Sequence, residues 1–155
     1  MGADRCGKIS TGLSALEKPP QFSQQILPQC KLVYTYMQLL VRRAETNLGD
    51  LCANACLDQS GADIAFLSGG CVRVDIARGD ITVKDILSVH PFGSMLTVIE
   101  VTGQQVLDAL EWGCRAVPEE SGAFPQVAGM TFEIHTYIKS SCTQDEDGMT
   151  DAQCI

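Results

Sequence analysis

The chain has 155 residues, 45% of them hydrophobic, which is enough for a single domain with a core of its own. Its net charge is −8 and its isoelectric point is near 4.6, and an acidic surface of this kind repels phosphate backbones. We therefore expect neither nucleic acid nor a membrane as a partner. The longest apolar run, over 32–41, is too short to cross a bilayer, and the first residues lack the apolar stretch of a secretory signal.

The first 40 residues predict an irregular lead-in. Gly, Pro and Ser are frequent there, prolines at 19, 20 and 28 oppose a regular element across them, and apolar periodicity is weak. The end of this segment is ambiguous, because strand formers are followed by helix formers over 31–41. At the other end of the chain, residues 143–155 are acidic and poor in apolar residues, which predicts a frayed tail.

Beyond the lead-in, the pattern becomes regular. Apolar spacing of three and four over 48–56 predicts a helix, with Thr46 or Asn47 as its N-cap and Gly61 as its stop. A short buried strand is expected over 62–67, directly after that glycine.

A brief helix and a strand follow. Thr82 and Asp85 have the spacing of a capping box, which begins a helix, and Pro91 ends it because the residue before a proline is pushed out of the helical region. The β-branched segment 95–101 is typical of a strand.

The last part of the regular region adds a third helix and a third strand. Thr102 and Gln105 cap a helix whose apolar stripe runs over 106–114, and a loop over 118–125 leads to a strand over 130–137. The alternation of helices and strands predicts an α/β domain, in which helices pack on a mixed sheet.

The centre of the chain carries the candidate site. Gly69 and Gly70 follow the expected strand and lead to Arg73, and Phe92 and Gly93 form a turn after the short helix. Glycine lets a ligand approach main-chain N–H groups, a guanidinium suits phosphate or carboxylate, and an exposed aromatic ring stacks on a base. Together these residues predict a pocket for a small, flat, anionic molecule.

The same residues have plain structural interpretations as well. Arg73 is placed to form an ion pair with Asp75 or Asp80, and Phe92 after its proline is able to fill the core. His90 is expected to be a structural histidine rather than a catalytic one.

Eight cysteines and only two histidines occur in the chain. Zinc sites show paired ligands at short spacing, and only Cys52 and Cys56, one helical turn apart, come close to that pattern. Because cysteine is commonly a small buried hydrophobe, reduced thiols in the core are the favoured interpretation, with a metal on this pair as the minor alternative.

Several motifs stand in order at regular spacing, and their sequence is distinctive. They are RRAETNLGDL (42–51), GADIAFLSGGCVR (61–73), GDIT (79–82) with HPFG (90–93), VTGQQVL (101–107) and FPQVAG (124–129). In this order they resemble the C-terminal domain of the 5′-nucleotidase family, which includes UDP-sugar hydrolases and 2′,3′-cyclic-nucleotide phosphodiesterases. The resemblance predicts a lead-in over 1–40, a 5′-nucleotidase C-terminal-like domain over 41–142 and a tail over 143–155.

The resemblance also implies roles for the site residues. In this family the C-terminal domain supplies the nucleotide pocket, and an N-terminal metallophosphatase domain holds two divalent metal ions. By position, Arg42 and Arg73 match the arginines that contact the phosphate or ribose, with Arg43 as an alternative to the first. Phe92 matches the aromatic residue that stacks on the base, and the glycines at 69–70 match those that line the pocket.

Some positions depart from the family pattern. Ser68 stands where the family has an asparagine that bonds the base, Cys71 where a third glycine is usual, and Ser94 where asparagine or glycine is usual. The family continues after the position of Cys142 with more strands and a second stacking aromatic residue. The resemblance therefore implies an incomplete domain.

The metal-ligand motifs of the metallophosphatase domain are absent from the sequence. We expect a nucleotide-binding domain of a phosphate-ester hydrolase, without catalytic residues, metal or cofactor of its own and inactive alone. Its expected partners are a nucleotide or nucleoside and a separate metallophosphatase domain. A stand-alone nucleotide-binding module and a non-functional fragment of a disrupted gene are the alternatives. The family is usually exported, but the sequence assigns no compartment.

Overall fold

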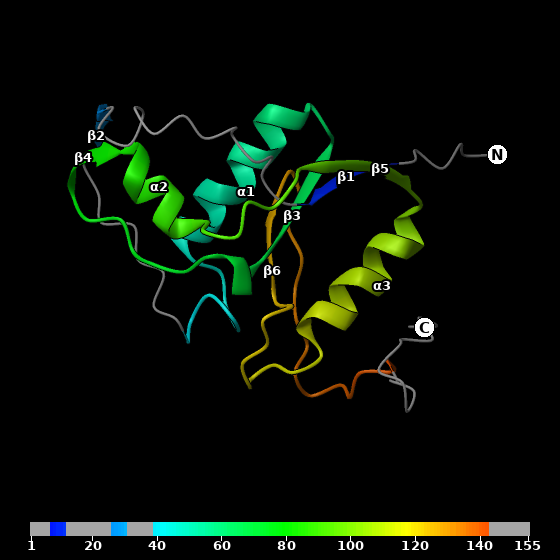
Figure 1. The fold of residues 1–155 in the computed structure, drawn as a ribbon. Helices are drawn as coiled ribbons and strands as arrows, with labels where there is room; N and C mark the ends of the chain where they lie inside the picture. The colour runs from blue at the N-terminus through cyan, green and yellow to red at the C-terminus, as the bar shows by residue number, and fades with distance from the viewer. Residues whose placement is uncertain (1–6, 12–25, 31–38, 143–155) are drawn as a thin grey trace.

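The computed structural model describes residues 7–11, 26–30 and 39–142 (Figure 1). The strands are β1 Gly7–Thr11, β2 Ile26–Cys30, β3 Ile64–Ser68, β4 Gly79–Thr82, β5 Thr97–Val101 and β6 Pro125–Ala128. The helices are α1 Asn47–Ser60, α2 Val83–Val89 and α3 Gly103–Cys114, with one turn of 3₁₀-helix at Gly69–Cys71.

A mixed sheet forms the centre of the molecule. Its strand order is β5-β1-β3-β6, with β1 parallel to β3 and the other two pairs antiparallel. A separate antiparallel pair joins β2 to β4. This architecture confirms the predicted α/β class with helices packed on a mixed sheet.

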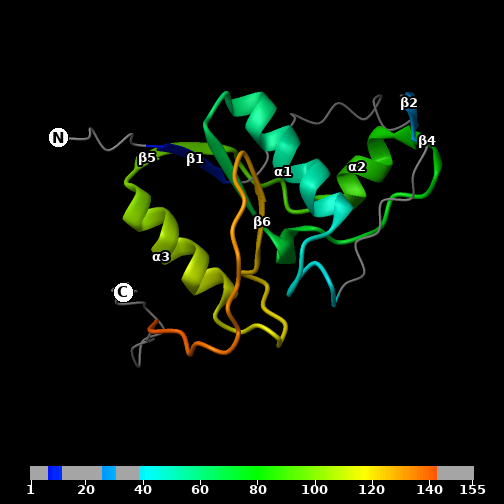
Figure 2. The same ribbon diagram turned by 180° about the vertical axis from the view of Figure 1, so that it is seen from behind.

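Helices α1 and α3 lie on opposite faces of the sheet (Figures 1 and 2). Successive strand residues point to opposite faces. Ala65 and Leu67 of β3 accordingly join the buried core with α1, whereas Phe66 between them packs on the other side against Val106 and Leu110 of α3.

The predicted helix boundaries are confirmed. Thr46 caps α1 through a hydrogen bond that its hydroxyl accepts from the N–H of Gly49, and Gly61 ends the helix at φ +62°. Thr82 and Thr102 each form the complete capping box that the sequence predicts for α2 and α3. Local side-chain chemistry was enough to place these ends.

Two strands lie where the sequence predicted an irregular lead-in. β1 pairs with β3 on one side and β5 on the other, and β2 pairs with β4. The prediction is wrong at these strands, because they obtain their hydrogen bonds from segments far along the chain. The expectations for residues 31–38 and for the tail over 143–155 lie outside the described residues.

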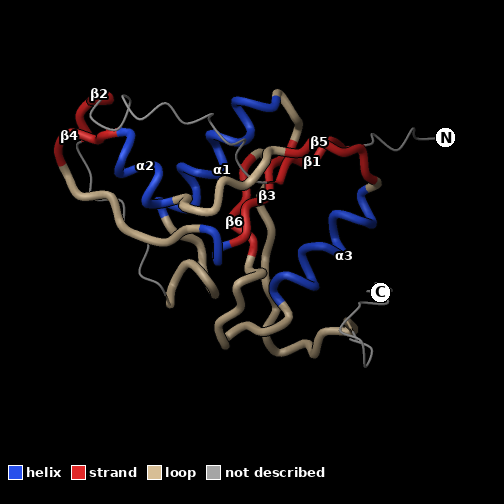
Figure 3. The backbone as a smooth tube through the Cα atoms, in the orientation of Figure 1, coloured by secondary structure: helices blue, strands red, loops and turns tan. Residues whose placement is uncertain are grey.

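The last predicted strand is also wrong. Residues 130–137 contain no strand, and β6 lies before them instead (Figure 3). The backbone of β6 pairs with β3, and the chain then turns at Gly129, whose φ is +80°. Met130 and Phe132 follow and pack against the α3 side of the sheet. Their apolar spacing therefore serves side-chain packing without strand pairing.

Four described cysteines are free thiols, namely Cys52, Cys56, Cys71 and Cys114. Cys142 is disulfide-bonded, so the expectation of reduced thiols is wrong at that position. Among the described residues, no group of three or more His, Cys, Asp or Glu side chains is arranged to hold a metal ion. Nor does any helix in the described ranges have the length and apolarity to span a membrane.

Candidate functional site

The glycine turn after β3 is held by two other segments. The N–H of Gly69 donates to the carbonyl of Phe124 at 2.8 Å, and the N–H of Gly70 donates to that of Gly122 at 3.0 Å. A Cβ on Gly69 would lie 2.0 Å from the carbonyl oxygen of Val41. These glycines thus permit close approach of the protein's own backbone, and their N–H groups are already used. Contact of either with a ligand stays a prediction.

Arg73 and Phe92 come together next to this turn. The Arg73 guanidinium carbon lies 5.7 Å from the centroid of the Phe92 ring, within the range of a cation–π interaction. Nη1 of Arg73 also donates to the carbonyl of Gly70 at 3.3 Å, and its backbone N–H donates to Val89 at 3.0 Å. The arginine is thereby fixed from three directions.

Phe92 is 62% exposed, so the interpretation in which it fills the core is wrong. Gly93 follows with a φ of +61°, in the left-handed region that favours glycine, and a Cβ there would meet nothing within 4 Å. The conformation of the turn, rather than lack of space, therefore accounts for glycine at this position. The turn leaves Phe92 largely exposed to solvent.

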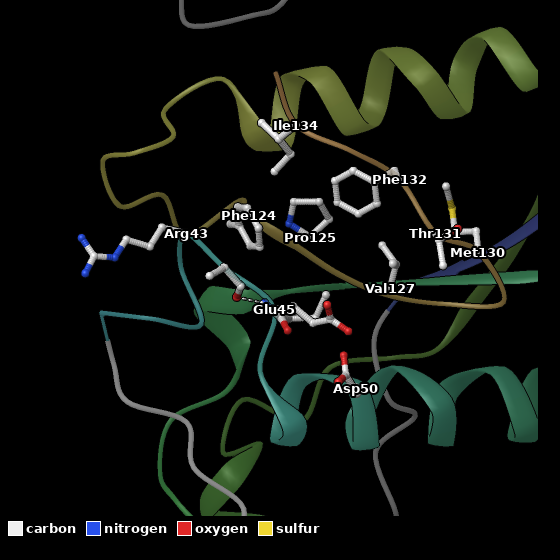
Figure 4. A pocket seen from close by; sticks show the side chains of 12 residues that line it. Arg43, Glu45, Asp50, Phe124, Pro125, Val127, Met130, Thr131, Phe132 and Ile134 are labelled. Carbon is white, nitrogen blue, oxygen red and sulfur yellow. Dashed lines mark hydrogen bonds between the residues drawn. The ribbon is translucent and has the colours of Figure 1, made fainter. Parts of the chain in front are cut away.

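Arg42 lies in the segment that packs against the glycine turn. Its carbonyl accepts a hydrogen bond from the N–H of Ser121 at 2.9 Å, and the preceding carbonyl, that of Val41, abuts Gly69. The Nε atom of Arg42 is buried without a hydrogen-bond partner in the part of the chain that the structure describes. Arg43, the alternative, is exposed and lines the neighbouring cavity, with its guanidinium directed away from the other lining side chains (Figure 4).

His90 lies immediately before the Phe92 turn and is half-buried. Burial lowers its pKa, and a hydrogen bond with the backbone of Cys71 opposes that shift only in part. Burial thus favours the neutral imidazole, and its Nε2 is buried without a hydrogen-bond partner among the described residues, so a structural role stays a prediction. Sequence reasoning gave no role to Gln126, which is 1% exposed and hydrogen-bonded to the Arg42 segment. Its only signal in the sequence was a place within the FPQVAG motif.

A cavity of about 340 Å³ is lined in part by residues 43–45 of the segment that carries Arg42 (Figure 4). Phe124, Pro125 and Phe132 line it, together with Glu45 and Asp50, and neither Arg73 nor Phe92 belongs to its wall. Burial and, secondly, the charge of Glu45 raise the pKa of Asp50. Two carboxyl groups disfavour a phosphate, and of the residues predicted for the anion site the cavity wall includes the alternative arginine, Arg43.

The model of the family "5′-nucleotidase, C-terminal domain" matches residues 31–144. The Bacillus subtilis "Trifunctional nucleotide phosphoesterase protein YfkN" is 46% identical over 96 residues, which are 59% of this chain and 7% of that protein. A "5′-nucleotidase" of Vibrio parahaemolyticus is 44% identical over 95 residues, which are 61% of this chain and 17% of that protein.

The crystal structure of a 5′-nucleotidase precursor from Thermus thermophilus has the same fold over 82% of this chain and 27% of its own, with a TM-score of 0.71 and 31% identity. The chain thus spans less than a third of the length of each of these relatives. All the motifs that carried the resemblance lie inside the region matched by the family model. The chain belongs to the 5′-nucleotidase C-terminal domain family.

Proposed function

We propose that this chain is the substrate-binding domain of a 5′-nucleotidase-type hydrolase and binds a mononucleotide at Arg73 and Phe92. The observation that carries the proposal is the 5.7 Å approach of the Arg73 guanidinium to an aromatic ring that is 62% exposed. The open ring face suits a base, and the guanidinium suits the ribose or phosphate of the same molecule. Arg42 is a second cation for the phosphate.

The reaction of the family, hydrolysis of a phosphate ester in nucleotide catabolism, uses two divalent metal ions in the metallophosphatase domain. We assign metal chemistry to that domain, supplied elsewhere in the parent protein or by a separate chain. The purified chain is then expected to release no phosphate from AMP in the presence of Mg²⁺, Mn²⁺ or Zn²⁺. Metal-dependent release that survives repeated purification would contradict this division of labour.

The expected affinity is low. Stacking of a base on one aromatic ring contributes about 1–3 kcal/mol, and a charge-assisted hydrogen bond to the phosphate adds about as much. A dissociation constant of 1 mM corresponds to about 4 kcal/mol. AMP is therefore expected to bind with a dissociation constant on the order of 1 mM.

Titration of the ¹⁵N-labelled chain with AMP tests the site. Amide shifts are expected at Arg73, Phe92 and Gly93, and Phe92→Ala is expected to weaken binding by about 5- to 150-fold, from the stacking energy. Tyr137→Ala is the matched control, because that ring is 82% exposed and belongs to a different segment. Equal affinity in the Phe92 and control variants would refute the proposed stacking.

The arginine has a matched control as well. The Arg115 guanidinium lies 3.4 Å over the Trp112 ring, so it forms the same kind of pair away from the proposed site. Arg73→Ala is expected to weaken the binding of AMP more than that of adenosine, because adenosine lacks the phosphate. Arg115→Ala is expected to change the affinity for neither ligand. If Arg73→Ala weakens the binding of AMP and of adenosine equally, Arg73 contacts the ribose and not the phosphate.

A further inference from the structure

A buried carboxamide joins β6 to the segment that carries Arg42. Nε2 of Gln126 donates to the carbonyls of Val41 at 3.1 Å and Ala44 at 2.8 Å. Oε1 accepts from the N–H of Thr46 at 3.1 Å and from its hydroxyl at 3.4 Å. A primary amide has two N–H donors and an oxygen with two lone pairs, so the full hydrogen-bonding capacity of Gln126 is spent on this one segment.

The segment over 41–46 belongs to no helix or strand. The N–H groups of Arg43 and Ala44 both donate to the carbonyl of Leu40, which folds the segment on itself as a turn. The side chain of Gln126 therefore forms hydrogen bonds with the backbone of this segment, as a neighbouring strand does within a sheet. It reaches the segment on both sides of Arg42.

The carboxamide packs directly against the first turn of α1. A Cβ on Gly49, in the first turn of α1, would lie 2.0 Å from Oε1 of Gln126. Glycine at that position thus allows the helix to close over the amide. Because the side chain is 1% exposed, water does not replace its hydrogen bonds.

One carbonyl connects this network to the site. The oxygen of Val41 accepts from Gln126, and it is also the atom that a side chain on Gly69 would strike. The amide thus sets how closely the Arg42 segment approaches the glycine turn, to which the Arg73 side chain is bonded through Gly70. Arg42 itself keeps a buried Nε without a partner among the described residues.

We infer that Gln126 is a positioning residue, which binds no ligand but fixes Arg42 relative to the Arg73 side of the site. The inference rests on the proposed nucleotide site. If Gln126 only stabilised the fold, its replacement would weaken ligand binding in every background alike. If Gln126 acts through Arg42, its replacement weakens ligand binding only in chains that keep Arg42.

A double-mutant cycle separates these two roles. Gln126→Met keeps the length of the side chain and removes its hydrogen bonds, and we expect it to weaken AMP binding by about 3- to 10-fold. In the Arg42→Ala background the same change is expected to have no effect on affinity, whereas in the Arg73→Ala background the loss is expected to persist. An equal loss in all three backgrounds, or unchanged affinity of the single variant, would overturn the inference.

Hydrogen exchange on the wild-type chain gives a readout that needs neither ligand nor variant. The Thr46 amide donates to Gln126, and the amides of Arg43 and Ala44 depend on the turn that Gln126 holds. We expect all three to exchange within about tenfold of the rates inside α1. Exchange at unprotected rates would overturn the inference even if Gln126→Met failed to fold. If the wild type fails to bind AMP, the proposed function is refuted, and exchange alone then decides whether Gln126 fixes the segment.

Discussion

Replacement of Gly49 by alanine tests the packing that surrounds the buried amide. In an ordinary helix this change stabilises a protein by about 0.5–1 kcal/mol, because glycine loses more backbone entropy on folding. In this chain the added Cβ would lie 2.0 Å from Oε1 and 2.6 Å from Cγ of Gln126. The amide must move, although it is held by hydrogen bonds to Val41, Ala44 and Thr46.

The two effects have opposite signs, and their sizes decide the outcome. Each lost hydrogen bond costs about 1 kcal/mol net, and a buried group left without a partner costs about 1–3 kcal/mol. Loss of two or more of these bonds outweighs the gain in helix propensity. We therefore expect Gly49→Ala to lower the free energy of unfolding by about 1–3 kcal/mol, with the melting temperature falling by about 2–4 °C for each kcal/mol.

Urea denaturation followed by circular dichroism measures the change. Gly103→Ala is the matched control, because Gly103 lies in the first turn of α3 and a Cβ there would meet nothing within 4 Å. The control is expected to be as stable as the wild type or slightly more stable. A Gly49→Ala variant as stable as this control would refute the view that Gln126 is fixed in place.

Three further outcomes are expected. Hydrogen bonds from Thr82 hold the pKa of Asp85 below its ordinary value, so the ionised carboxylate stabilises the fold at neutral pH. This contribution is lost as the pH falls through the lowered pKa, below about pH 4. Asp85→Asn should therefore be less stable than the wild type at pH 7, with a difference that shrinks in acid denaturation curves; a constant difference would contradict this. Iodoacetamide at pH 8 should label half-exposed Cys71 well before Cys52, whose pKa is raised by burial to about 12, and mass spectrometry showing equal labelling would count against this order. Gly93→Ala should cost about 1–2 kcal/mol in chemical denaturation from its positive φ alone, and a neutral effect would exclude strain at the turn.

The helix ends could be predicted because their causes are local. Thr82 and Asp85 are three residues apart, and Thr102 and Gln105 have the same spacing, so each capping box is complete within one turn of chain. Gly61 ends α1 in the left-handed conformation for the same kind of reason. No distant contact is needed for any of these positions.

The strands were harder to predict because their partners are distant in sequence. β1 and β2 lie in a segment of weak periodicity, yet β1 occupies an inner position in the described sheet. Over 130–137 the alternation of apolar residues was real, but Met130 and Phe132 use it to pack on the side of α3. Side-chain pattern indicates which face is buried, whereas a strand also requires a backbone partner.

The sequence by itself determined the family, the helix boundaries and the identity of the candidate site residues, because motifs and caps are written in short runs of the chain. Only the tertiary structure decided that the Arg73 guanidinium meets an open Phe92 ring and that the glycine N–H groups are engaged by the 121–124 loop. The same is true of the amide of Gln126, which is hydrogen-bonded to residues 80 to 85 positions away. Such contacts depend on how the sheet and its loops pack in three dimensions, and no local pattern encodes that distance.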